Sequence, residues 1–167
     1  MNIVVFDAKP YDIEFFEKWN KQYGARITYY SEKLTLKTAA VLTKYQDVVC
    51  TFVNDDLNEK VIEILSRNGV RAIAIRAAGY NNVDIRAAYH NRVTVFRVPA
   101  YSPYAVAEHA LALLMTVNRK TNKAYNRTRE GNFSLVGLTG IDLNGKTAGV
   151  IGTGKIARIF IKILNGL

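Results

Sequence analysis

Short apolar runs alternate with helical patterns along the first hundred residues. The apolar runs predict five strands, at residues 3–6, 26–30, 47–53, 71–76 and 93–98. Apolar side chains at helical spacing predict the helices between them, at residues 11–23, 35–44, 58–67 and 84–91. Strands that alternate with helices are typical of a parallel sheet, and nearly unbroken apolar runs suit strands covered on both faces. The pattern therefore predicts an α/β fold.

A longer helix is predicted over residues 103–118, with Ser102 as its N-cap and a proline at its first position. Apolar side chains cover nearly its whole circumference, and only Glu108, His109 and Thr116 interrupt them. A helix that is apolar all round is buried on more than one side. We therefore expect a second domain or a second subunit to lie against it.

The last apolar run leads into the pattern Gly-x-Gly-x-x-Ala at residues 152–157. Gly152 permits a tight turn from strand to helix, Gly154 lets a pyrophosphate approach the backbone, and Ala157 lets the helix pack on its strand. The pattern predicts the strand, Gly loop and helix that open a dinucleotide-binding fold. The residues from Thr147 onward are fewer than the roughly 30 of a complete βαβ unit, so we expect only part of a NAD site.

Composition narrows the class of protein. The net charge of +9 comes from 23 basic and 14 acidic residues, and their dispersion along the chain favours a solvated surface over a nucleic-acid site. Cys50 is the only cysteine, which excludes an intramolecular disulfide and suits a reducing compartment. No apolar run approaches the roughly 18 residues of a membrane span, and the first residues predict a strand rather than a signal peptide. We therefore expect a cytoplasmic protein without a membrane partner.

Ligands of open α/β sheets bind at the carboxyl ends of the strands. Three predicted loops meet at that edge, at residues 52–56, 76–81 and 98–101. Arg76 could hold a carboxylate there, but we favour a structural pairing. His109 could act as an acid–base, but its place in an apolar helix favours a structural, hydrogen-bonded role. Cys50 lies in mid-strand and is expected in the core, and we predict no metal ligands.

Seven segments of the sequence resemble the D-2-hydroxyacid dehydrogenases, and the similarity is closest to the fermentative NAD-dependent D-lactate dehydrogenases of bacteria. They are FVNDD (52–56), AGYNNVD (78–84), RVPAYSP (97–103), AVAEHA (105–110), NFSL (132–135), GLTG (137–140) and GKTAGVIGTGKI (145–156). These segments span nearly the whole chain in the order expected for the family. Family members are about twice as long, so the chain resembles their N-terminal half.

The resemblance implies an architecture in three parts. Residues 1–100 would form a flavodoxin-like substrate domain, residues 101–145 an interdomain and dimerisation segment, and residues 146–167 the start of a NAD-binding Rossmann domain. The family's active site lies in the cleft between its two domains. The helix over residues 103–118 resembles the one that is buried between domains and subunits in the family's homodimers.

The resemblance also implies roles for individual residues. Ala77, Ala78 and Gly79 resemble the loop whose N–H groups receive the substrate carboxylate. Phe52 stands where an aromatic ring lines the substrate pocket. Tyr101 resembles the tyrosine that closes over the substrate, although it could instead act as a hydrophobic staple on the following helix. The residues that match the pyrophosphate loop of the cofactor site are Gly152, Gly154, Lys155 and Ile156.

The implied function is NAD-dependent interconversion of a D-2-hydroxy acid, D-lactate first among them, and its 2-oxo acid. The family's chemistry uses an arginine that grips the carboxylate, an acid–base histidine and a carboxylate that orients the histidine. All three are expected beyond Leu167, so no catalytic residue is assigned and we expect the chain alone to be inactive. The alternative is a non-catalytic interaction module, or a truncated remnant, that acts through the apolar helix.

Overall fold

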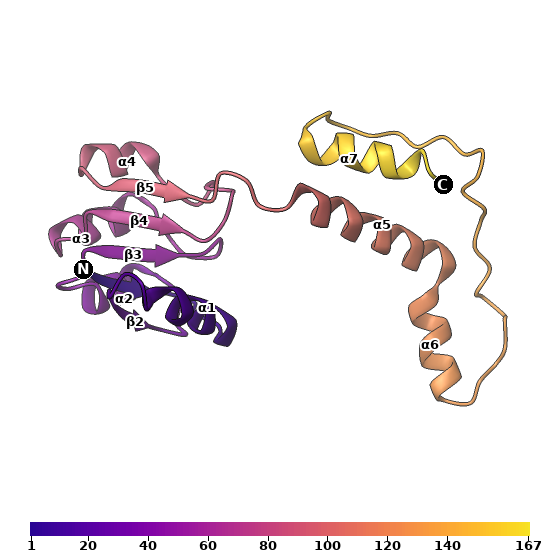
Figure 1. Ribbon diagram of the computed structural model, residues 1–167, viewed down its shortest axis with the longest axis horizontal. Coiled ribbons are helices and arrows are strands. Elements are labelled where there is room, and N and C mark those ends of the chain that lie inside the picture. The colour runs from indigo at the N-terminus through magenta and orange to yellow at the C-terminus, as the bar shows by residue number, and fades with distance from the viewer. The chain divides into compact units, whose positions relative to one another are not determined.

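The computed structural model describes residues 1–167, which divide into two compact units (Figure 1). The first unit is Met1–Tyr101 and the second is Ser102–Leu167. The second unit therefore joins most of the predicted interdomain segment to the Gly-rich segment. None of the helices has the length and apolar character needed to cross a membrane.

A five-stranded parallel sheet forms the centre of the first unit, in the order β2-β1-β3-β4-β5. Its strands are β1 (Asn2–Val5), β2 (Arg26–Tyr29), β3 (Val48–Thr51), β4 (Ala72–Ile75) and β5 (Thr94–Arg97). In the middle of the sheet, Val49 of β3 is paired with Val4 on one side and Ile73 on the other. This order is that of flavodoxin-like sheets, and it confirms the predicted α/β fold.

Four helices connect the strands, and side-chain caps set where most of them begin. They are α1 (Pro10–Asn20), α2 (Leu36–Leu42), α3 (Glu59–Arg67) and α4 (Ile85–His90). The side chain of Thr35 accepts from the N–H of Thr38 at 3.3 Å, and that of Asn58 accepts from the N–H of Val61 at 3.1 Å. Each cap satisfies one of the free N–H groups in a first helical turn. All four helices form within a few residues of their predicted positions.

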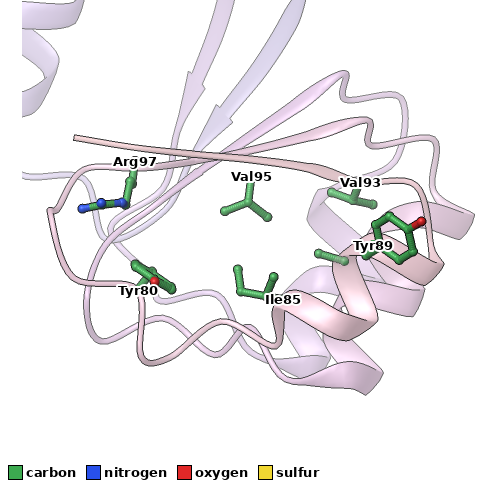
Figure 2. A pocket seen from close by; sticks show the side chains of 7 residues that line it. Tyr80, Ile85, Tyr89, Val93, Val95 and Arg97 are labelled. Carbon is green, nitrogen blue, oxygen red and sulfur yellow. The ribbon is translucent and has the colours of Figure 1, made fainter. Parts of the chain in front are cut away.

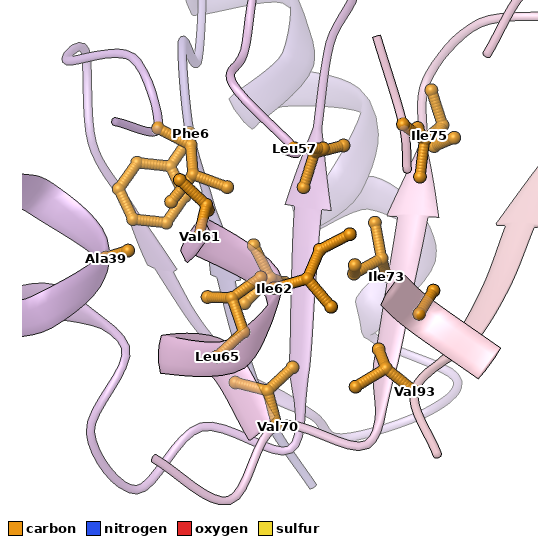
Figure 3. Close-up of a cluster of buried hydrophobic side chains, with 14 of the residues drawn as sticks. Phe6, Ala39, Leu57, Val61, Ile62, Leu65, Val70, Ile73, Ile75 and Val93 are labelled. Atoms are coloured by element: carbon orange, nitrogen blue, oxygen red, sulfur yellow. The ribbon is translucent and has the colours of Figure 1, made fainter. Parts of the chain in front are cut away.

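The two faces of the sheet are covered unequally. Helices α2, α3 and α4 lie on one face, where they bury the main core, and α1 lies alone on the other. Figure 3 shows the main core, in which Ile62 of α3 reaches toward Ile73 of β4, both without exposed surface. The smaller core under α1 contains Val5, Ala8 and Cys50. Cys50 is 4% exposed, which confirms its predicted place in the core.

The second unit contains α5 (Pro103–Arg119), α6 (Thr121–Arg129) and α7 (Lys155–Leu164), and α5 packs against α7. Helix α6 was not predicted, because its sequence is polar nearly all round. Ser102 caps α5 as predicted, accepting from the N–H of Ala105 at 3.2 Å. The left-handed backbone of Lys120, with a φ of 52°, separates α5 from α6. Between α6 and α7 the backbone is irregular.

One expectation for the second unit is wrong within this chain, and one stays untested. No strand forms before the Gly loop, and Ile151 is fully exposed. A parallel strand needs a neighbour to receive its hydrogen bonds, and the second unit contains no other strand. Within this unit the apolar helix α5 leaves Leu113 and Val117 54% and 75% exposed, so the second domain or subunit expected against it stays a prediction. Only Ala107 of this helix is buried, because within the unit α7 covers just one of its sides.

The main core supplies a first test of the fold. We expect Ile62→Ala to lower the free energy of unfolding of the first unit by about 2–5 kcal/mol, because it leaves a cavity among fully buried side chains. Trp19, the only tryptophan, lies in this unit, so its fluorescence during urea unfolding measures the loss. Lys60→Ala, at an exposed position of the same helix, is the control. Equal midpoints for the two variants would contradict the assigned core.

Candidate functional site

The carboxyl ends of the parallel strands bring the candidate residues of the first unit to one edge of the sheet. Phe52 follows β3, Ala77 follows β4 and Tyr101 lies beyond β5. In a sheet of this order, the loops after β1 and β3 diverge to opposite faces and leave a crevice between them. The loop after β1, which was not among the predicted loops, therefore belongs to the same edge.

Asp55 holds the loop after β3 in place. Its carboxylate is 3% exposed, and it accepts the N–H of Leu34 through Oδ1 and the N–H of Phe52 through Oδ2, each at 2.6 Å. Burial raises the pKa of this carboxyl, while the N–H groups of Phe52 and Leu34 and the charge of Arg76 oppose that rise. The side chain thereby ties the segment after β2 to the segment after β3.

Asn82 joins the loop after β3 to the loop after β4. Its side-chain Nδ2 donates to the carbonyl of Asp55 at 2.9 Å and to that of Phe52 at 3.3 Å. A short parallel bridge between Leu57 and Val83 continues the connection. The structure therefore fixes Phe52 relative to the loop that carries Ala77, Ala78 and Gly79.

The 77–79 loop (Ala77, Ala78 and Gly79) offers backbone donors that nothing in the protein uses. None of its three N–H groups forms a hydrogen bond within the chain. Its carbonyls are engaged instead, that of Ala77 by the N–H of Val98 at 3.1 Å and that of Ala78 by Nη1 of Arg97 at 2.8 Å. Consecutive free N–H groups in a bent backbone are a common binding site for anions such as carboxylates.

Arg76 has a structural role, which confirms the interpretation favoured from the sequence. Its Nη2 donates to the carbonyls of Phe6 and Asp7 at 3.0 and 3.2 Å, and its Nε lies 3.4 Å from a carboxylate oxygen of Asp12. The guanidinium also lies 5.6 Å from the ring centroid of Phe52. Arg76 thus joins the loop after β1 to Phe52. Burial raises the pKa of the neighbouring Cys50 thiol, which keeps that thiol protonated.

The loop after β1 adds a pair of charged groups that sequence reasoning did not single out. Asp7 has a left-handed backbone with a φ of 48°, and its side chain is nearly buried. Its Oδ1 lies 2.7 Å from Nζ of Lys9, and this hydrogen bond raises the pKa of the lysine. Applying the carboxyl-end rule to β1 as well as to the later strands would have identified both residues.

Two further candidates, Tyr101 and His109, form no hydrogen bond in the structure. Tyr101 is 76% exposed and forms no hydrogen bond. His109 is also exposed and makes no hydrogen bond, so its predicted structural role is wrong; the residues around it on α5 leave it facing solvent. His90 is exposed at the end of α4. That helix end precedes β5, and it therefore lies at the amino edge of the sheet, opposite the candidate loops.

The candidate cofactor residues lie at the start of α7 in the second unit. Gly152 has a φ of +89°, which a side chain would strain, and Gly154 is the N-cap of the helix without a side-chain hydrogen bond. A hollow of about 450 Å³ lies between this loop and α5, with Lys155, Ile156 and Ala107 among its lining residues. The uncapped helix start and the open approach to Gly154 fit a phosphate group.

Metal chemistry has no support from the arrangement of side chains. Nowhere do three or more histidine, cysteine, aspartate or glutamate side chains gather in a way that could hold an ion. Asp7 is already paired, because its carboxylate bonds to Lys9 and its carbonyl accepts from Arg76.

Comparison with known proteins gives these features a context. The family model for the catalytic domain of D-isomer-specific 2-hydroxyacid dehydrogenases matches residues 3–158. The chain is 51% identical to 2-hydroxyacid dehydrogenase homolog 1 of Schizosaccharomyces pombe, over 98% of this chain and 49% of that protein. It is 48% identical to D-lactate dehydrogenase of Escherichia coli, whose apo structure matches with a TM-score of 0.90 over 99% of this chain and 52% of that one.

A more distant solved structure was determined with a cofactor. The D-isomer-specific 2-hydroxyacid dehydrogenase from Lactobacillus delbrueckii ssp. bulgaricus, in its NAD-complexed form, is 25% identical and has a TM-score of 0.67. That match covers 99% of this chain and 51% of the other. The chain spans about half the length of the curated relatives it matches.

The role of Asp55 can be tested by removing its charge alone. We expect Asp55→Asn to lower the free energy of unfolding by about 1–3 kcal/mol, because an amide NH₂ must then face one of two buried N–H donors. Urea unfolding followed by Trp19 fluorescence measures the change. Asp56→Asn is the matched control, since the Asp56 side chain is exposed and bonds only to Asn58. A loss no larger than that of the control would show that Asp55 does not anchor the loop.

Proposed function

The chain belongs to the family of D-isomer-specific 2-hydroxyacid dehydrogenases, and from this premise we propose that it serves the NAD-dependent interconversion of a D-2-hydroxy acid and its 2-oxo acid. D-lactate and pyruvate are the proposed pair, because D-lactate dehydrogenases are among its relatives. The observation that carries the proposal is the set of unused N–H groups at Ala77, Ala78 and Gly79. A carboxylate is the group that both members of the pair share.

Each candidate residue of the first unit has a part in holding this substrate. The N–H groups of the 77–79 loop donate hydrogen bonds to the carboxylate. Hydrogen bonds to a charged acceptor of this kind are short and strong. Phe52 supplies an apolar wall beside that loop, and Arg76 keeps its ring in place from one side. Tyr101, which is exposed, closes over the substrate. These groups orient the acid and exclude water from it.

The second unit supplies part of the cofactor site. Gly152 and Gly154 allow the pyrophosphate to approach the backbone, and the N–H groups at Lys155 and Ile156 face it from the first turn of α7. NAD, when bound, accepts or supplies the hydride at C2 of the substrate. We place the reaction in the cytoplasm, because the single buried thiol suits a reducing compartment.

We further propose that a polypeptide of these 167 residues binds the acid but does not turn it over. Turnover requires an acid–base that reaches the substrate oxygen. His90 lies at the amino edge of the sheet, away from the 77–79 loop, and His109 is an exposed residue of α5. Without a positioned acid–base, the transition state gains little stabilisation.

Binding can be measured directly at the proposed donors. We expect oxamate, an unreactive analogue of pyruvate, to shift the amide NMR signals of Ala78 and Gly79 with an affinity in the millimolar range. Propionamide, which has similar size but no carboxylate, is the matched ligand control. Equal responses to both ligands, or shifts confined to other loops, would refute the carboxylate site.

The same preparation tests the absence of turnover. NADH and pyruvate are added at saturating concentrations, and the absorbance of NADH is followed against a buffer blank. We expect the two rates to be equal. A faster rate in a preparation free of other dehydrogenases would contradict the proposal and would place an acid–base within these residues.

A second function is favoured by one observation on α5. This helix exposes Val106, Leu113 and Val117 by 42%, 54% and 75%, and exposed apolar side chains that share a helix mark protein–protein contacts. We propose that α5, over residues 103–118, pairs with the same helix of a second copy to form a homodimer. As an alternative to catalysis, this surface alone would make the chain an interaction module.

Light scattering during size-exclusion chromatography tests the homodimer. We expect the chain to elute with the mass of two copies at high concentration. Placing charge on the surface with Leu113→Glu and Val117→Glu should return it to the mass of one copy, because two carboxylates would face each other in an apolar contact. Asn122→Glu on α6 adds the same charge at an exposed position and should leave the dimer intact. A single-copy mass for the unmodified chain would exclude the homodimer.

A further inference from the structure

Arg97, the last residue of β5, has an unusual set of contacts for an arginine. Its Nη1 donates to the carbonyl of Ala78 at 2.8 Å, and its guanidinium lies 5.3 Å from the ring centroid of Tyr80. It takes part in no ion pair, and Ala78 is the only acceptor that it reaches. The only hydrogen bond of its side chain is therefore made to the backbone of the 77–79 loop, which carries the unused N–H groups.

These contacts determine which way the donors of the loop point. Every peptide bond in the chain is trans, so the carbonyl of one residue and the N–H of the next point in opposite directions. The carbonyl of Ala77 faces β5 through the N–H of Val98, and the carbonyl of Ala78 faces β5 through Arg97. The N–H of Ala78 therefore points away from the Val98 backbone, and the N–H of Gly79 points away from the guanidinium of Arg97.

Ala77 packs against the main core, but side-chain packing does little to hold the Ala78–Gly79 peptide in this orientation. Figure 2 shows Arg97 and Tyr80 at one end of a hollow between β5 and α4, with Tyr89 and Val93 at the other. The hollow has a volume of about 330 Å³. No close-packed core therefore backs Tyr80, which is 45% exposed. The hydrogen bond and the stacked guanidinium are the contacts left to fix the Ala78–Gly79 peptide.

We propose that Arg97 is a positioning residue for the substrate carboxylate: it holds the carbonyl of Ala78 so that the N–H of Gly79 is aimed at the bound acid. The inference rests on the proposed function of the 77–79 loop. Donors that are already aligned need no reorganisation when an anion arrives, and they bind it more tightly for that reason. Arg97 itself does not touch the substrate in this arrangement. The one hydrogen bond of its guanidinium lies on the opposite side of the peptide from the N–H of Gly79.

Three variants of the full 167-residue chain separate this role from the loss of charge. Arg97→Met keeps the length of the side chain and removes the donor. Arg97→Lys keeps the charge and can still donate a hydrogen bond, but it loses the flat group that lies over the ring of Tyr80. Arg86→Met, at an exposed position of α4 without hydrogen bonds, removes the same charge away from the loop. Sheet amide signals in the NMR spectrum show that each variant is folded.

Two quantities are measured for each variant, the backbone order parameters of Ala78 and Gly79 and the oxamate affinity. We expect the order parameters to fall from about 0.85 to below about 0.6 in Arg97→Met. Oxamate affinity should fall about tenfold in the same variant, because a donor that is no longer aligned must be ordered when the anion binds. Arg97→Lys should lie between Arg97→Met and the unmodified chain. Arg86→Met should match the unmodified chain in both quantities.

The outcomes that overturn the proposal are distinct. Unchanged order parameters in Arg97→Met would show that the loop is held by other contacts. A loss of oxamate affinity with unchanged order parameters would assign Arg97 to direct contact with the anion, and would also refute positioning. If oxamate shifts no signal of Ala78 or Gly79 even in the unmodified chain, the proposed function itself fails. The order parameters would then still report whether Arg97 fixes the peptide.

Discussion

The buried carboxylate of Asp55 is the interaction on which the candidate site depends. It satisfies two backbone N–H groups that come from different loops, and an apolar side chain there would leave both donors buried and unpaired. Asn82 then attaches the next loop to the carbonyls of the segment that Asp55 has fixed. The carboxyl edge of the sheet, with the candidate site, is thus held by a short series of polar contacts. The series begins inside the protein and ends at its surface.

Much of the fold follows from local sequence patterns, and the exceptions have a common cause. The five strands and their helices were predictable because each carries its own apolar run or stripe, and caps such as Asn58 mark where helices begin. Helix α6 lacks an apolar stripe, so no helical periodicity of apolar residues predicts it. The strand expected before Gly152 does not form, because a strand exists only through its neighbours. Patterns predict what a segment prefers, and partners decide whether it forms.

The candidate site was predictable in position but not in detail. The carboxyl-end rule and the family resemblance located Phe52 and the 77–79 loop on one edge. The roles of Asp55, Asn82 and Arg97 depend on contacts that span 21, 27 and 19 residues of sequence, and no local spacing reveals such contacts. His109 failed for a related reason. Its burial depends on what packs against α5, which its own sequence does not specify.

Strand β5 is one of the two edge strands of the sheet, and its free backbone groups could pair with a strand of another molecule. Phe96 within it is 59% exposed, which would make such pairing favourable and would lead to aggregation. Arg92 and Arg97 stand on either side of this apolar run, and Pro99, which has no N–H to donate, follows it. Charges and prolines in these positions oppose the addition of a strand. Arg97, which binds the carbonyl of Ala78, is thus also one of the charges that oppose strand addition at this edge of the sheet.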